Sequence, residues 1–293
     1  MKRREVLNSP QMEKVQRERK VKGRNKILLV FLCFILIFEI FVFISRIKNI
    51  NVASISISGN NIVETKGIMN VVQKDLSGKY FLFPKTNIFL LSKNKIISDL
   101  HKQFPRLLDV KVYRKDLKSI SIVVSERSGR YLWCGNSTDD ISKKIAEESC
   151  YYLDSTGYIF DRAPSFSGDV YFTFYGSEGN IDTGNPVTQK IAERNIFENI
   201  VQFKNFLDTM KIHTFGVYIK GDGTYEMLIS DGDRSYNAPK IIFNNENIID
   251  KIASNLSSAL KAEPFATEFK TKLSQLLYID LRFNSKVVYK FTK

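Results

Sequence analysis

An apolar run at residues 27–44 constrains the fold more than any other feature of the sequence. It reads ILLVFLCFILIFEIFVFI, with Glu39 as the one charged residue and neither Gly nor Pro. A helix of this length, at about 1.5 Å per residue, reaches roughly across the hydrocarbon core of a bilayer. In a soluble domain such a helix would have to be buried on every face. The run therefore predicts one transmembrane helix in preference to a buried core helix.

A cleavable signal peptide is the main alternative to an uncleaved anchor. The apolar region of a signal peptide spans about 7–15 residues and ends at an A-x-A-like site. Here the run is longer, and the sequence SRIKN that follows at residues 45–49 offers no pair of small residues. We therefore expect an uncleaved membrane anchor at residues 27–46.

The distribution of charge predicts the orientation of this anchor. Residues 1–26 contain ten Lys or Arg and three Glu, a net charge of +7 out of +13 for the whole chain. After Lys48 no basic residue occurs before Lys66. The positive-inside rule then places residues 1–26 in the cytoplasm and the chain from about residue 47 outside the cell membrane. We expect the tail to be a short disordered arm attracted to anionic lipid, and not a nucleic-acid-binding segment.

Glu39 lies roughly a turn and a half from the outer end of the predicted transmembrane helix. Placing a charged carboxylate in hydrocarbon costs a few kcal/mol of free energy, so this side chain must be neutralised, moved toward the headgroups or paired. Protonation, snorkelling toward the headgroups and contact with a partner helix are the three alternatives, and the sequence leaves them open.

Two cysteines outside the predicted membrane helix flank a polar insertion. Cys134 and Cys150 bound residues 135–149, which lie between the apolar runs 131–133 and 151–153. If those runs pair as antiparallel strands, the two cysteines can face each other and close the loop with a disulfide. Two free thiols are the alternative.

The region after the anchor alternates between strand and helix patterns. Residues 52–57 alternate as a strand, and two amphipathic helices follow, the second ending before Pro105. Two further strands are expected at residues 108–113 and 119–125. The predicted order is strand, helix, helix, strand, strand: a small sheet with both helices on one face, and therefore an α+β fold.

The sequences and order of these segments resemble a POTRA domain, and specifically that of the bacterial cell-division family FtsQ/DivIB. The matching pieces are ISISGN at 55–60, Phe104-Pro105, VKVYR at 110–114, VVSER at 123–127 and YYLDSTGYIF at 151–160. Near the C-terminus, YIDLRF at 278–283 is similar to the motif that ends the β-domain of that family. The resemblance implies a POTRA domain at 50–127 and a mixed β-domain at 128–293.

Within residues 128–293 the patterns predict a strand at 170–175 and a helix that starts at Asn185-Pro186 and buries residues between Ile196 and Met210. Hairpin strands are expected at 215–220 and 224–230, and another strand at 240–243. A last helix should bury Ile248, Ile252 and Leu256 and stop at Pro264.

The sequence lacks the motifs that would indicate an enzyme. It contains two histidines, His101 and His213, in separate predicted domains, and no HExxH, GxSxG, P-loop or GxGxxG motif. We therefore expect no catalysis, no metal, no cofactor and no small-molecule substrate.

The C-terminal residues 286–291 predict a last strand with an exposed edge, which could accept an extended partner segment. The family resemblance implies that this region binds FtsB/DivIC and FtsL, with Phe283 and Ser285 at positions tied to that contact. We add Lys286, Val288 and Tyr289 as partner-binding residues from the geometry of an edge strand. Phe283 and Tyr289 could equally be ordinary core aromatics.

Three functions compete on this basis. The first is a non-catalytic, single-pass scaffold of the division septum in the cell (inner) membrane, with FtsB/DivIC, FtsL and FtsK types as partners. The second is a POTRA-bearing transport or secretion component that acts with a pore protein. The third, a membrane-tethered wall enzyme, would need a polar catalytic cluster that the sequence does not indicate.

Overall fold

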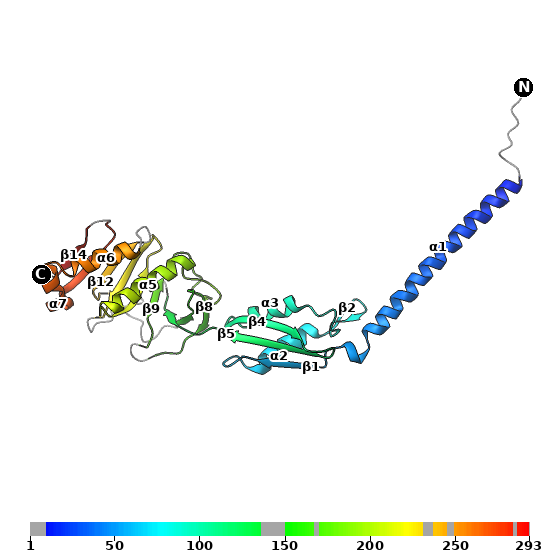
Figure 1. The fold of residues 1–293 in the computed structure, drawn as a ribbon, viewed down its shortest axis with the longest axis horizontal. Helices are drawn as coiled ribbons and strands as arrows, with labels where there is room; N and C mark the ends of the chain where they lie inside the picture. Colours follow the sequence, from blue (N-terminus) through cyan, green and yellow to red (C-terminus); the bar gives the residue numbers. More distant parts are fainter. Residues whose placement is uncertain are drawn as a thin grey trace, which may run out of the picture. The chain divides into compact units, whose positions relative to one another are not determined.

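The computed structural model describes residues 10–135, 150–166, 170–230, 237–244, 249–283 and 286–292, with side chains from residue 14 onward. The described chain falls into two compact units. The first comprises residues up to 103 together with 109–125, and the second comprises 104–108 and 126–293. Figure 1 shows a mixed α+β protein with one long N-terminal helix.

Helix α1 (Pro10–Ser45) contains the apolar run and is the one described helix that is long and apolar enough to cross a membrane. It begins well before residue 27, so most of the basic tail is helical and the expectation of a disordered arm is wrong from Pro10 on. Lys, Arg, Glu and Gln are good helix formers, and a helix already nucleated in the apolar run extends into them at little cost.

The first unit continues after α1 with a three-stranded sheet and two helices. Its elements are η1 (Lys48–Ile50), β1 (Ser54–Ser58), α2 (Thr65–Leu76), β2 (Lys79–Tyr80), β3 (Phe83–Pro84), α3 (Lys93–Gln103), β4 (Leu107–Arg114) and β5 (Ser119–Glu126). The sheet order is β1-β5-β4, with β1 and β5 parallel. The expected strand and helix order is therefore present, with the short hairpin β2–β3 added between the helices.

The burial pattern shows why this sheet forms. Buried residues alternate along β4 and β5, and the serines of β1 are exposed. Both helices carry one buried stripe, ending in Leu76 on α2 and Leu100 on α3, and they contact each other. One face of the sheet is therefore covered by both helices, and the other faces solvent.

The second unit is built on one nine-stranded sheet. Its strands are β6 (Tyr131–Trp133), β7 (Tyr151–Leu153), β8 (Ile159–Arg162), β9 (Thr173–Gly176), β10 (Thr214–Ile219), β11 (Thr224–Ile229), β12 (Lys240–Asn244), β13 (Leu276–Asp280) and β14 (Val288–Phe291). Their order in the sheet is β14-β13-β12-β11-β10-β9-β6-β7-β8. The pairs β6–β9, β9–β10 and β12–β13 are parallel.

Helices α5 (Arg194–Thr209), α6 (Ile249–Ala259) and α7 (Phe265–Thr271) pack on this sheet, and η2 (Leu273–Gln275) leads into β13. Phe203 and Leu207 of α5 are fully buried against strand residues such as Phe243. The core of the second unit therefore lies between these helices and one face of the sheet.

Two helix boundaries differ from the sequence prediction. Helix α5 starts at Arg194 and not at Asn185-Pro186, because the segment after Pro186 pairs with β8 through hydrogen bonds of Thr188 and Gln189 with Ile159. Pro264 does not end α6, which already stops at Ala259; it instead immediately precedes α7. Tertiary pairing and a second, short helix override the local signals at these points.

Candidate functional site

Strand β14 forms one edge of the nine-stranded sheet. Among the described strands its one neighbour is β13, with which it pairs antiparallel from Asp280↔Val288 to Leu276↔Phe291. At the opposite edge, β8 is covered by the chain around residue 189, which exchanges hydrogen bonds with Ile159 and forms a bridge from Tyr158 to Lys190. The two edges thus differ, and β14 is the one that presents a strand for pairing.

The side chains of β14 alternate between the core and the face of the sheet opposite the helices. Tyr289 belongs to a row that runs across the strands through Ile279, Ile241 and Met227, all buried in the core. Its ring stacks on Phe265 of α7, with the ring centroids 4.1 Å apart. Tyr289 therefore packs in the core. The residues on either side of it in β14 point to the face of the sheet opposite the helices.

Val288 and Lys290 lie on the face of the sheet opposite the helices. Val288 continues a row formed by Asp280, Ile242, Glu226 and Tyr218 in successive strands. Lys290 lies opposite Tyr278, which lies opposite Lys240. Val288 is 40% exposed and Lys290 is exposed, so the edge presents an apolar and a basic side chain side by side.

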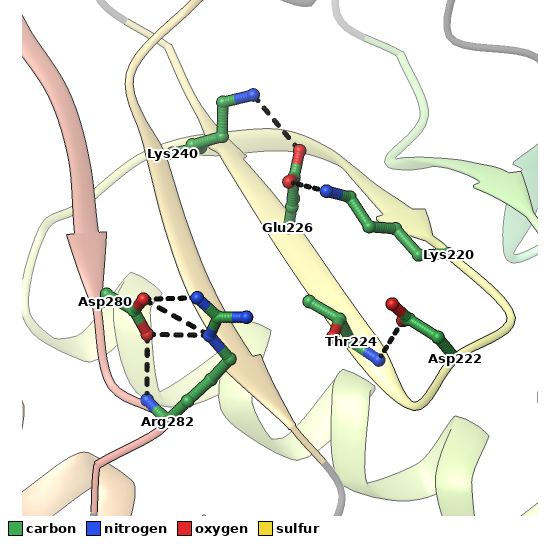
Figure 2. Close-up of polar contacts among 7 residues, drawn as sticks. All are labelled: Lys220, Asp222, Thr224, Glu226, Lys240, Asp280 and Arg282. Atoms are coloured by element: carbon green, nitrogen blue, oxygen red, sulfur yellow. Dashed lines mark hydrogen bonds and ion pairs between the residues drawn. The ribbon is translucent and has the colours of Figure 1, made fainter.

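Two ion-pair groups lie on the face of the sheet opposite the helices (Figure 2). The Glu226 carboxylate, 3% exposed, lies between the Lys220 and Lys240 ammonium groups, at 2.5 Å and 3.1 Å. Its charge is thereby compensated inside the sheet. This arrangement could not be read from the sequence, because it depends on which residues of β11 and β12 are opposite each other.

Asp280 and Arg282 form the second group, directly beside the edge strand. The Arg282 guanidinium binds both carboxylate oxygens, with Nη2 2.6 Å from Oδ2, and the Arg282 backbone N–H donates to Oδ1 at 3.1 Å. Burial alone would raise the pKa of the Asp280 carboxyl, but these hydrogen bonds hold it below its usual value. The pair fixes the chain where it leaves β13 toward β14.

The remaining predicted partner-binding residues lie along the connection from β13 to β14. Phe283 is 49% exposed and Lys286 is exposed, so neither is an ordinary core residue. Ser285 lies outside the described residues. The structure thus brings Phe283, Lys286 and Val288 to one end of the second unit, close to the Asp280–Arg282 pair in the chain.

Cys134 and Cys150 form a disulfide, with their Cα atoms 4.4 Å apart. The flanking runs pair as antiparallel strands β6 and β7, with Trp133 opposite Tyr151. Cys33, in α1, is free and exposed. Glu39, also in α1, is exposed along the apolar helix.

Within the described parts of the chain, no group of three or more His, Cys, Asp or Glu side chains is placed to hold a metal ion. His101 is half-buried in the first unit and His213 is exposed in the second. A shallow cavity of about 590 Å³ is lined by Glu178, Lys220 and Asp222 among others. Its charged groups are engaged with neighbours: Glu178 accepts a hydrogen bond from Tyr225, and Asp222 accepts one from the Thr224 backbone N–H.

No family model matches this chain. Over 105 residues, 34% of the chain, it is 29% identical to an uncharacterised protein of Dictyostelium discoideum. The match spans 3% of the length of that protein.

Proposed function

We propose that the protein is a single-pass membrane scaffold of the bacterial divisome, of the FtsQ/DivIB type, and that it performs no catalysis. It binds other division proteins outside the membrane and links early division components to septal wall synthesis. The observation that carries this proposal is the edge of β14, which pairs with no second strand among the described residues and carries the exposed side chains of Val288 and Lys290.

The organisation of the rest of the chain supports the proposal. One apolar helix precedes a unit with the order strand, helix, helix, strand, strand, which is the order expected for a POTRA domain. The YIDLRF motif forms the end of β13 and the start of the connection to the edge strand, where the resemblance places partner contact. Partners of the FtsB/DivIC and FtsL types, and possible FtsK-type partners, follow from the same resemblance.

An edge strand binds an extended segment through its backbone N–H and C=O groups, and its side chains then select the partner. Val288 offers apolar contact and Lys290 favours acidic residues in the partner segment. Phe283 and Lys286 supply further exposed side chains at the same end. Glu39 adds a polar position at which α1 can contact a partner helix within the membrane.

Co-purification of the full-length protein with an FtsB/DivIC-type partner tests this proposal. Val288→Glu places a charge at the edge and should reduce retention of the partner at least about tenfold, a loss equivalent to about 1.4 kcal/mol. Val170→Glu is the matched control, because Val170 is also an exposed valine of the second unit but lies in the segment that leads into β9. If the two variants retain the partner equally, the edge strand is not part of the binding site.

A further inference from the structure

The hairpin β2–β3 packs against the outer end of α1. The rings of Phe38 in α1 and Phe83 in β3 meet edge to face, with centroids 5.9 Å apart. Val42 and Ser45 are 9% and 6% exposed, while most of α1 is exposed. Phe38, Val42 and Ser45 are spaced by four and three residues and so lie on one helical face. This covered stripe shows where the rest of the first unit packs against α1.

Hydrogen bonds fix this contact. The Ser45 carbonyl, at the C-terminal end of α1, accepts from the side-chain amides of Asn51 and Asn87, both at 3.0 Å. The Arg46 guanidinium donates to the Leu82 carbonyl at the tip of the hairpin, at 3.4 Å. Carbonyls at a helix end lack partners within the helix, so these amides satisfy a group that would otherwise need water.

The contact sets the depth of the hairpin relative to the membrane. Phe38 precedes the end of the apolar run by six residues, which corresponds to roughly 9 Å along a helix. Because Phe83 lies beside Phe38, it is level with a part of α1 that occupies hydrocarbon when the helix spans a bilayer. The two-residue loop at the tip of the hairpin directly precedes Phe83.

The composition of that loop is unusual for a hairpin exposed to water. Lys79 pairs with Pro84 and Tyr80 with Phe83, which leaves Phe81 and Leu82 as the two central residues. Tight hairpins favour Gly, Asn or Asp at such positions because one or both need a positive φ. Phe81 adopts a φ of 55° and is 84% exposed. The backbone of Phe81 is therefore strained, and its ring is unfavourably exposed in water, whereas an apolar surrounding would favour the ring.

Basic residues flank the aromatic tip. Residues 77–98 contain four lysines and no acidic residue, and Lys79 and Lys85 border the hairpin directly. The Lys85 ammonium lies 5.4 Å from the centroid of the Tyr80 ring. Aromatic rings with neighbouring lysines are typical of protein segments at the boundary between headgroups and hydrocarbon.

We propose that the β2–β3 hairpin is a second membrane contact, which inserts Phe81 and Leu82 into the outer leaflet beside α1 while Lys79 and Lys85 meet the headgroups. The occupant of this surface is the lipid bilayer, because the hairpin is continuous with the covered stripe of the anchor helix. The proposal rests on α1 spanning the membrane and is independent of which proteins bind the edge strand.

Site-directed labelling of the full-length protein tests the proposal. Cys33→Ser removes the free thiol, and the Cys134–Cys150 disulfide stays oxidised without reductant. Phe81→Cys is then labelled with an environment-sensitive fluorophore, and the protein is reconstituted in vesicles of phosphatidylcholine and phosphatidylglycerol. Ile62→Cys is the matched control. Ile62 is 61% exposed and belongs to the same unit, but it follows the C-terminal end of β1 and is not part of the hairpin. Unchanged emission of Trp133 reports an intact second unit in each variant.

The label at position 81 should show blue-shifted emission, quenching by nitroxide-bearing lipids and protection from iodide, while the label at position 62 behaves as in water. Leu82→Cys, whose φ is not positive, gives a second position at the tip should Phe81→Cys not fold. Solvent-like emission at the tip would overturn the proposal. A blue shift without quenching by the nitroxide lipids would overturn it too, since the tip would then be buried against protein, such as a second copy of the chain.

Discussion

At the scale of single residues, Asp154 shows how one carboxylate organises a turn of the second unit. Its Oδ1 accepts from the Thr156 backbone N–H and hydroxyl, both at 2.7 Å, and from the Tyr158 N–H at 3.2 Å. The other oxygen pairs with Arg127, whose guanidinium also lies over the Tyr158 ring. Asp154 is 5% exposed, so its charge depends on these partners.

Asp154→Asn should destabilise the second unit. The amide oxygen can keep the contacts to Thr156, but the amide nitrogen would then face the Arg127 guanidinium, donor against donor. We expect a loss of about 2–3 kcal/mol in the free energy of unfolding. Urea unfolding followed through Trp133, the one tryptophan of the chain and a buried residue of this unit, measures it. Asp161→Asn is the control, because Asp161 pairs with Arg106 with its side chain 45% exposed, and it should cost less than about 1 kcal/mol.

The same residue predicts a dependence on pH. Burial opposes ionisation of Asp154, but its hydrogen bonds prevail and the pKa of the carboxyl lies below its usual value. A lowered pKa in the folded state means that the stabilisation is complete above the pKa of the unfolded chain and disappears as the pH falls through the folded-state pKa. The stability difference between wild type and Asp154→Asn should therefore shrink below about pH 4. A difference that stays constant down to pH 2 would contradict this account.

At the scale of secondary-structure elements, β14 combines packing on one face with exposure on the other. Tyr289 should therefore matter for stability and Val288 for binding. Tyr289→Ala removes the ring stacked on Phe265 and should cost about 1–3 kcal/mol, since the side chain is half-buried. Val288→Glu should cost less than about 0.5 kcal/mol, as expected of an exposed position. Urea midpoints of the full-length variants in detergent measure both, and equal losses would refute the assignment of the two faces.

The elements also show which parts of the fold the sequence could predict. The stripe Ile200, Phe203 and Leu207 of α5 repeats with helical spacing, so its buried face was predictable. Its start was not, because the pairing of Thr188 with Ile159 joins segments that are distant in the chain. An edge strand was expected at residues 286–291, and β14 is an edge strand in the order of the described sheet.

The charged groups on the sheet face opposite the helices show what the sequence could not predict. Glu226 belongs to β11 and Lys240 to β12, while Lys220 directly follows β10, so the ion pairs join parts of the sheet that the sequence alone does not align. Their meeting depends on the register between β11 and β12. The alternation of residues along one strand assigns each of them to a face of the sheet. It does not determine which residues of two neighbouring strands pair with each other.

At the scale of the whole molecule, the chain combines an apolar helix, a small sheet with two helices and a larger sheet unit in which β14 is an edge strand among the described strands. The net charge of +7 in residues 1–26 favours a cytoplasmic N-terminus, and the proposed function requires the chain that follows α1 to lie on the other side of the membrane. A scaffold with this topology needs no catalytic cluster. It needs a fixed place in the membrane and a surface that selects partners, and the two can be separated by mutation.

Live imaging of an N-terminal fluorescent fusion in the native or a related bacterium tests this division of roles. Under the proposed function the wild-type fusion should form a band at midcell, because partner contact through β14 would recruit it to the septum. The Val288→Glu fusion should remain in the membrane, held by α1, but lose the band, while Val170→Glu should keep it. A uniform membrane outline for the wild type would contradict a division role while leaving the topology intact. It would favour a POTRA-bearing transport component, since that function requires the same anchor but no recruitment to midcell.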